Sequence, residues 1–143
     1  MPGPGTWSAG DVLTADDLNA IGTWQTYVPV LTQNVTRTAT VTSASYCQIN
    51  KFCVVNVDLT CTTTGSANSI SVSLPVNTAA TSGAAVLGSG VFFDTSASDY
   101  ILVTCVRGSN STVSFYKDLD GGLLATTLGN GDVLSFSLTY QTV

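Results

Sequence analysis

The stretch Tyr46-Cys-Gln-Ile-Asn-Lys-Phe-Cys-Val-Val-Asn-Val-Asp-Leu-Thr-Cys61 decides the fold of this chain. Asn50-Lys51 stands between two runs of strand-forming residues and predicts a two-residue hairpin turn. After the turn, apolar and polar residues alternate with the period of a strand that buries one face. The apolar set is Val55, Val57, Leu59 and Cys61, and the polar set is Asn56, Asp58 and Thr60.

The same alternation continues along most of the chain after Trp24. Pro29 lacks an amide hydrogen, so the segment that contains it is expected at a sheet edge. About nine short strands separated by turn signals predict an all-β fold, an antiparallel β-sandwich of jelly-roll-like form. Besides the hairpin, strands are expected near 34–41, 70–74, 86–93, 100–107, 112–118, 123–128 and 132–142, with turns at Asp120-Gly121-Gly122 and Asn130-Gly131-Asp132.

Two of these expected strands, 100–106 and 133–140, carry apolar residues on both faces in places. A strand of a sandwich normally leaves one face in water. An interface between subunits produces burial on both faces, and so does a thick core.

One short helix is expected before the first strand. Thr14 can act as its N-cap, and Gly22 is a natural left-handed stop. Leu13 and Leu18 are spaced as a hydrophobic staple. Such a helix has only about two turns and needs a packing partner to persist. The chain is therefore divided into an N-terminal arm and helix, residues 1–23, and a β-sandwich head, residues 24–143.

The charge of the chain limits its partners. Only 9% of the 143 residues are charged and the net charge is −5, against about 25% charged residues in ordinary domains. A weakly charged surface favours association of copies, so an oligomer is expected, and a monomer with a hydroxyl-rich surface is the alternative. Four scattered basic residues exclude a nucleic-acid footprint. No apolar run approaches the ~18 residues of a membrane span, so membrane insertion is not expected.

The sequence lacks the side chains that usually serve as catalytic bases. The chain has no His, and a Ser or Cys nucleophile needs an adjacent base. We therefore expect no enzymatic activity, no cofactor and no metal. Cys47, Cys53, Cys61 and Cys105 contain no CxxC pair, and free buried thiols are expected. A disulfide from Cys105 to one of the other three stays open.

Five segments resemble, in order, parts of small virion and minor tail proteins of tailed bacteriophages, of fibre or decoration-like type. They are the opening Thr6–Asn19, the segment Trp24–Thr32, the hairpin Tyr46–Val54, Ser73–Pro75 and the C-terminal Gly131–Tyr140. Asn50 stands where Gly is usual in that hairpin. The resemblance implies an N-terminal attachment segment and a β-sandwich head, commonly as a homotrimer.

The expected function is that of a structural component displayed on the virion surface, assembled in the bacterial host cytoplasm. A tail-associated protein of the tail tip or fibre that contacts the host is the first hypothesis. A capsid decoration (cement) protein that binds the major capsid protein is the second, and a carbohydrate-binding module is the third. The expected attachment or oligomer-interface residues are Trp7, Val12, Leu13, Leu18, Ile21 and Trp24. Tyr100 and Tyr116 are the candidates for surface recognition of a host cell-surface glycan.

Overall fold

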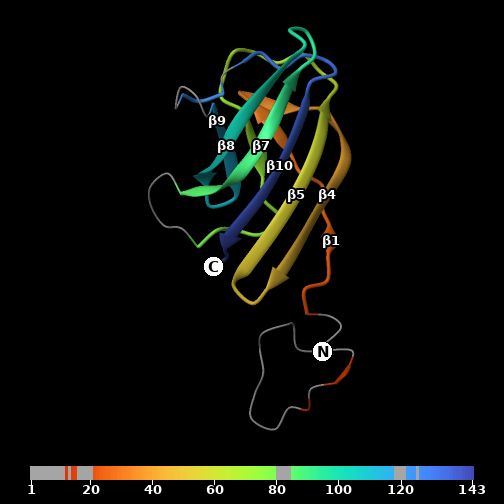
Figure 1. The fold of residues 1–143 in the computed structure, drawn as a ribbon, viewed down its shortest axis with the longest axis vertical. Coiled ribbons are helices and arrows are strands. Elements are labelled where there is room, and N and C mark those ends of the chain that lie inside the picture. The colour runs from red at the N-terminus through yellow and green to blue at the C-terminus, as the bar shows by residue number, and fades with distance from the viewer. Residues whose placement is uncertain (1–11, 13, 16–20, 80–84, 118–121, 125) are drawn as a thin grey trace.

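The computed structural model of the chain describes residues 12, 14, 15, 21–79, 85–117, 122–124 and 126–143. Ten strands pair in the order β1-β4-β5-β10-β7-β8-β9-β6-β2-β3, and every pairing is antiparallel (Figure 1). The all-β, antiparallel class predicted from the sequence is confirmed. The strands are β1 Gln25–Thr26, β2 Leu31–Gln33, β3 Val35–Arg37, β4 Ala39–Ile49, β5 Phe52–Cys61, β6 Ser71–Ser73, β7 Val86–Asp94, β8 Asp99–Ser109, β9 Thr112–Lys117 and β10 Val133–Gln141.

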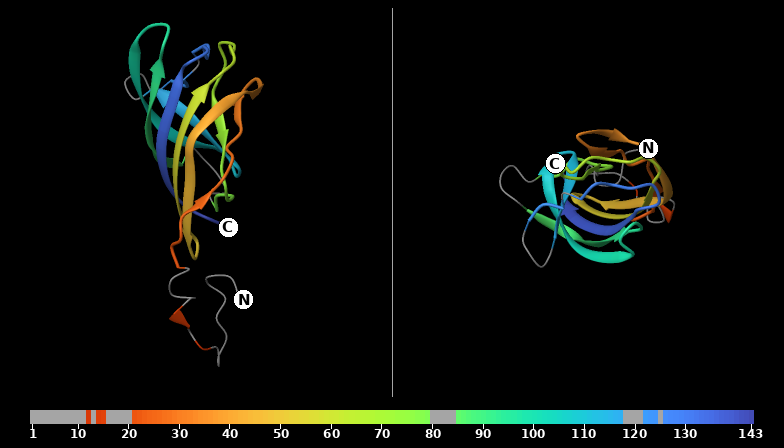
Figure 2. Two further views of the ribbon diagram at one scale, coloured as in Figure 1. Left: turned by 90° about the vertical axis from the view of Figure 1, so that its right-hand side faces the viewer. Right: turned by 90° about the horizontal axis from the view of Figure 1, so that it is seen from above.

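The sheet curls strongly, as the two views of Figure 2 show. β3 is last in the strand order and β4 is second, yet only Thr38 separates them in the chain. The two ends of the sheet are therefore brought together by the chain itself. Inside the curl lies one continuous apolar core that draws side chains from β2 and from β4 to β10. Leu31, Val55, Phe92, Phe115 and Phe136 are among its members.

The β4–β5 hairpin forms as predicted. Ile49 pairs with Phe52 across a two-residue turn, and Asn50 has a φ of 53°, a left-handed conformation that Asn tolerates well. Along β5, the odd-numbered residues from Cys53 to Cys61 are buried and the even-numbered ones are not. β10 pairs with the other side of β5, so β5 and β10 are interior strands of the sheet.

Two glycines in β7 allow it to approach β10 closely. Gly90 is paired with Phe136, and Gly88 with Leu138. A Cβ atom on Gly90 would collide with the carbonyl oxygen of Ser135 and with Phe136, and one on Gly88 would collide with the backbone of β10. Next to Gly90, Phe136 packs inside the curl with its ring 5.0 Å from that of Phe115.

The strand predicted over residues 123–128 is wrong. Among the described residues of this range, Leu123 makes an isolated bridge to Tyr116, and the others are not in a strand. Leu124 and Leu128 nevertheless lie fully inside the core. The alternation that predicted a strand therefore reflects burial, and the described part of the segment pairs with β9 only around Leu123, through the hydrogen bonds Lys117 N–H to Gly122 O and Leu124 N–H to Phe115 O.

The side chain of Gln33 binds the backbone farther along this segment, at Thr126 and Leu128. Its Nε2 donates to the carbonyl oxygens of Thr126 at 2.6 Å and Asn68 at 2.9 Å. Its Oε1 accepts from the amides of Ser66 at 3.0 Å and Leu128 at 3.3 Å. Gln33 is completely buried, and all four hydrogen-bonding positions of its amide are used. This single side chain joins β2 to two loops that are far away in the sequence.

The N-terminal part of the prediction is only partly described. The expected helix from Thr14 to Gly22 falls mostly on residues 16–20, which lie outside the described residues. Gly22 has a φ of 75°, the left-handed conformation predicted for it. The sheet-edge prediction from Pro29 holds for β1, at one end of the strand order, and is wrong for β2, which lies between β6 and β3.

All four cysteines are buried and free, as expected. The disulfide that the sequence left open for Cys105 is therefore not formed. Cys47 pairs with Val54 across the hairpin, while Cys53 pairs with Gln48. Because paired residues share a face, Cys47 and Cys53 lie on opposite faces of the sheet.

Replacement of Gln33 tests the role of its amide. Gln33→Leu leaves two buried carbonyl oxygens and two buried amides without their partner, so we expect a loss of about 3 kcal/mol in the free energy of unfolding. Urea unfolding followed by circular dichroism measures it. Gln141→Leu, at an exposed position, is the matched control and should change stability by less than about 0.5 kcal/mol. Equal effects of the two substitutions would contradict this role.

Candidate functional site

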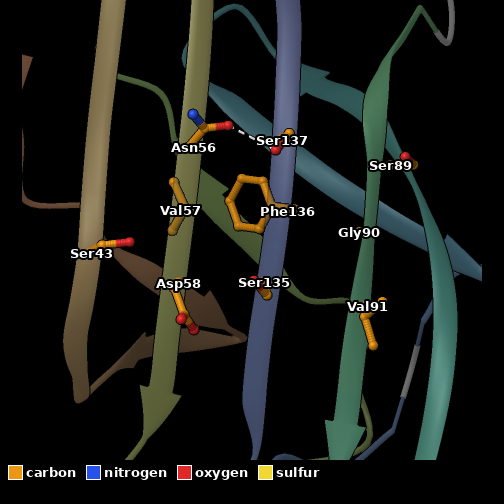
Figure 3. Close-up of a pocket in the computed structure, with 10 residues that line it drawn as sticks. All are labelled: Ser43, Asn56, Val57, Asp58, Ser89, Gly90, Val91, Ser135, Phe136 and Ser137. Atoms are coloured by element: carbon orange, nitrogen blue, oxygen red, sulfur yellow. Dashed lines mark hydrogen bonds between the residues drawn. The ribbon is translucent and has the colours of Figure 1, made fainter. Parts of the chain in front are cut away.

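The outer face of the sheet carries a shallow polar hollow of about 330 Å³ across β4, β5, β10 and β7 (Figure 3). Ser135 and Ser137 point outward because their neighbours Leu134, Phe136 and Leu138 point into the core. Ser137 donates a hydrogen bond of 2.7 Å to Oδ1 of Asn56. The remaining polar residues that line the hollow are Ser43, Asp58 and Ser89.

The chemistry of this hollow suits binding. Its polar side chains are short hydroxyls, one amide and one carboxylate, that of Asp58, and Val57, Val91 and Phe136 also line it. These groups can donate and accept hydrogen bonds with another polar molecule. Asp58 is the only carboxylate in the lining, so the paired carboxyl groups that hydrolysis of a glycoside needs are not present in it.

An apolar ridge borders the hollow on the outer face of β7 and β8. We use the name outer ridge for Val91, Phe93, Tyr100 and Leu102, which form the cross-strand pairs Phe93–Tyr100 and Val91–Leu102. The rings of Phe93 and Tyr100 lie 4.5 Å apart. Tyr100 is 71% exposed and Leu102 is 61% exposed. Large apolar side chains that share one exposed patch indicate a contact surface.

The sequence pattern predicted apolar residues on both faces of the strands at 100–106 and 133–140. The structure has them on both faces of the first, β8, but not of the second, β10. In β8, Tyr100 and Leu102 point outward while Val103 and Cys105 are buried. In β10, the outward residues after Val133 are Ser135, Ser137 and Thr139, so its outer face is polar. The Ser and Thr residues at alternate positions were the signal in the sequence for the polar hollow, which sequence reasoning missed.

Tyr100 and Tyr116 are not brought together. Tyr116 is half-buried and pairs with Thr104, which follows Tyr100 by four residues in β8. Four residues of a strand span about 13 Å. Tyr100 therefore lies in the outer ridge with Phe93 and Leu102, while Tyr116 lies farther along the sheet.

The turn that joins β7 to β8, next to Tyr100, is fixed by Asp94. Oδ1 of Asp94 accepts hydrogen bonds from the hydroxyl of Ser96 at 2.7 Å and from the amides of Ser96 at 2.9 Å and Ala97 at 3.0 Å. The hydrogen bond from the Ser96 hydroxyl, followed by that from the Ala97 amide, lowers the pKa of Asp94 below its ordinary value. The ionised form of Asp94 therefore stabilises this turn.

A second carboxylate ties the same turn to the start of β10. Asp132 is buried and accepts hydrogen bonds from the amides of Thr95 at 2.9 Å and Gly129 at 2.6 Å. The hydroxyl of Thr95 donates to the carbonyl oxygen of Gly131 at 2.7 Å. Gly131 has a φ of 96°, and the turn predicted around it is confirmed. The outer ridge is thus held at a rigid end of the sheet.

Of the six predicted attachment residues, Trp7, Leu13 and Leu18 are outside the described residues. Val12, Ile21 and Trp24 are exposed, and the structure does not bring them into one site. A Cβ atom on Gly22 would lie 3.3 Å from Cδ1 of Ile49 and 3.7 Å from Sγ of Cys47, so the chain reaches the head beside the β4–β5 turn.

From there Tyr27 enters the side of the head. Its amide donates to the carbonyl oxygen of Ala44 at 3.2 Å, and its ring meets that of Tyr46 edge-on at 6.0 Å. Burial raises the pKa of Tyr27, and the nearby Cys53 raises it further. The segment between Gly22 and Tyr27 is therefore the connection from the N-terminal part to the core.

No family model, curated protein or solved structure matches this chain. The described residues contain no group of three or more His, Cys, Asp or Glu side chains placed to hold a metal ion. In the same part of the chain, no helix has the length and apolar character needed to cross a membrane.

The pKa of Asp94 gives a test of the turn beside the outer ridge. In the folded protein, its carboxyl titration by NMR should have a midpoint below the ordinary value of about 3.9. Because the pKa is lowered on folding, the stability from this group is complete above pH ~4 and is lost as the pH falls through the folded pKa. Ser96→Ala should move the midpoint upward.

Ser89→Ala, a change of the same kind on the outer face of β7, is the control and should leave the Asp94 midpoint in place. A midpoint at or above the ordinary Asp value in the unmodified protein would contradict the hydrogen bonding described for this turn.

Proposed function

We propose that this chain is a non-enzymatic structural component of a tailed-phage virion, displayed on the particle surface. In this proposal it is a tail-associated protein of the tail tip or fibre that contacts the host. Residues 1–23 attach it to other virion proteins, and residues 24–143 form the head. Assembly takes place in the cytoplasm of the bacterial host.

The observation that carries this proposal is the separation of two exposed surfaces at opposite ends of the head (Figure 1). Gly22 lies at the β4–β5 turn, next to Ile49. Phe93 of the outer ridge is in register with Val133 and, through it, with Thr60. Thr60 is eight residues along β5 from Phe52 at that turn, which is about 26 Å. A protein anchored by its N-terminal segment presents the outer ridge away from its anchor.

The curled sheet supports such a role as a rigid spacer. We propose that it acts as a sandwich-like head of jelly-roll type, with β4, β5, β10 and β7 in one layer and β9, β6, β2 and β3 in the other. The core cluster contains residues of both groups of strands. Rigid β-scaffolds commonly present binding groups at their ends, and here the Asp94 and Asp132 hydrogen bonds fix one end.

A homotrimer is the proposed assembly. Exposed apolar residues at the N-terminal end, Ile21 and Trp24, support contacts between copies there, together with Trp7, Val12, Leu13 and Leu18 of the attachment segment. Head-to-tail contacts of this kind close into a ring when the rotation allows it. Copies joined at this end leave the outer ridges free at the other.

A host cell-surface glycan is the proposed target of the outer ridge. The Tyr100 ring offers an apolar face with a polar tip, and the adjacent hollow offers hydroxyl, amide and carboxylate groups for hydrogen bonds. Tyr116 lies on the same outer face of the sheet but apart from the ridge, so we assign it a secondary part in recognition.

The same geometry suits a capsid decoration protein, whose N-terminal segment would bind the major capsid protein. The two proposals differ in copy number. Quantitative mass spectrometry of purified particles should find a few copies for a tail protein, with immunogold labelling at the tail. Copies in the hundreds, with label over the capsid, would replace the first proposal by the second.

Adsorption of particles to host cells tests the outer ridge. Particles that carry the double substitution Tyr100→Ser and Leu102→Ser should adsorb at least about ten-fold more slowly, since loss of a central apolar contact commonly costs 2 kcal/mol or more. Val35→Ser, at an exposed position of β3, is the control. Unchanged adsorption, with equal incorporation of both variants into particles, would contradict host contact by the ridge.

A further inference from the structure

One row of side chains crosses the outer face of the sheet from the polar hollow to the outer ridge. The strand registers place five residues side by side along it, namely Ser43, Asp58, Ser135, Val91 and Leu102. Side chains that are directly opposite on neighbouring strands share a face and approach one another closely. The five strands are spaced by about 4.8 Å, so this row is about 19 Å long. The hollow and the ridge therefore form one continuous surface, which we call the cross-strand row.

The polar half of the cross-strand row keeps its hydrogen-bonding groups available. Asp58 is half-buried between Ser43 and Ser135, and no described residue forms a hydrogen bond or an ion pair with its carboxylate. Beside it, Oδ1 of Asn56 accepts the hydroxyl of Ser137, which leaves the Nδ2 group of Asn56 as a donor (Figure 3). A carboxylate that accepts, an amide that donates and hydroxyls that do both can bind a hydroxyl-rich molecule.

The charge of this surface has one sign. None of the four basic residues of the chain lines the hollow or belongs to the outer ridge. Asp58 lies in the hollow, and Asp94 and Asp99 form the cross-strand pair next to Phe93 and Tyr100. Like charges that meet across an interface weaken binding, and salt screens this repulsion where the charges are exposed. The surface therefore disfavours a ligand that carries carboxylate, sulfate or phosphate groups.

We propose that the cross-strand row binds a neutral glycan chain laid across the strands, and that Asp58 makes this site select against acidic glycans. The apolar face of one sugar unit lies on Tyr100 and Leu102, and hydroxyls of the units that follow bind Asp58, Ser43 and Ser135. An acidic unit in the hollow would stand beside Asp58 without a basic side chain to compensate its charge. This inference rests on the proposed function and deepens it, because it names the class of glycan and the residue that determines it.

Surface polysaccharide of the bacterial host provides the probes. It is separated by anion exchange into a neutral and an acidic fraction, and each fraction is titrated into the full-length chain at low salt. The neutral fraction should shift the NMR amide signals of Asp58, Ser135 and Val91, and the acidic fraction should bind at least about ten-fold more weakly. Stronger binding of the acidic fraction, or no shift at the row with either fraction, would overturn the proposal.

Asp58→Asn tests the assignment of selectivity to this carboxylate. Asparagine has nearly the same shape and no charge, and the change breaks no hydrogen bond between Asp58 and the described residues. The variant should bind the acidic fraction about ten-fold more tightly than the unmodified chain does at low salt, with a smaller gain at high salt. Asp11→Asn removes the same charge outside the row and is the matched control. Equal gains from both substitutions, or no gain from Asp58→Asn, would overturn the role of Asp58.

Adsorption of particles separates this inference from the proposed function. The soluble neutral fraction should compete with host cells for unmodified particles, and the acidic fraction should not. Competition by the acidic fraction alone, together with slower adsorption of the variant with Tyr100→Ser and Leu102→Ser, would leave host contact by the ridge in place and overturn the selection by charge. Unchanged adsorption of that double variant would instead contradict the proposed function.

Discussion

The structure depends on one constraint, which is that eight of the ten strands of a single curled sheet, β2 and β4 to β10, share one apolar core. The curl lets each of these strands bury one face while the other face remains outside, so a two-residue alternation is enough to place side chains. β5 shows the result most clearly, with every second residue from Cys53 to Cys61 buried. The close approach of β7 to β10 belongs to the same constraint, because a Cβ atom on Gly88 or Gly90 would collide with the backbone of β10.

Features that depend on neighbours in the sequence could be predicted. The β4–β5 hairpin follows from Asn50-Lys51 between alternating runs, and the turn at Gly131 follows from a local Gly signal. Features that depend on contacts between residues far apart in the sequence could not be predicted. The segment 123–128 has the pattern of a strand, but its backbone is bound by Gln33, about ninety residues away in the chain. No local rule indicates that a buried amide will replace a strand partner.

For the candidate surfaces, too, local features could be predicted from the sequence and long-range features could not. Tyr100 was a candidate for surface recognition, which needs an exposed side chain, and the structure has it exposed. Its grouping with Phe93 and Leu102 required the β7–β8 register, which the sequence pattern leaves open. The polar hollow needed the order of β5, β10 and β7, which no pattern within one strand contains. Leu13 and Leu18 stay predictions, since they lie outside the described residues.

The four buried cysteines have a practical consequence for following the dynamics of this molecule. A thiol enclosed in a packed core reacts with an alkylating reagent only when the surrounding structure opens. Cys53, Cys61 and Cys105 are in the core cluster, whereas Cys47 lies on the other face beneath Gly22 and Ile49. The alkylation rate of Cys47 therefore reports how often the N-terminal connection loosens. The alkylation rates of the other three cysteines report how often the core opens.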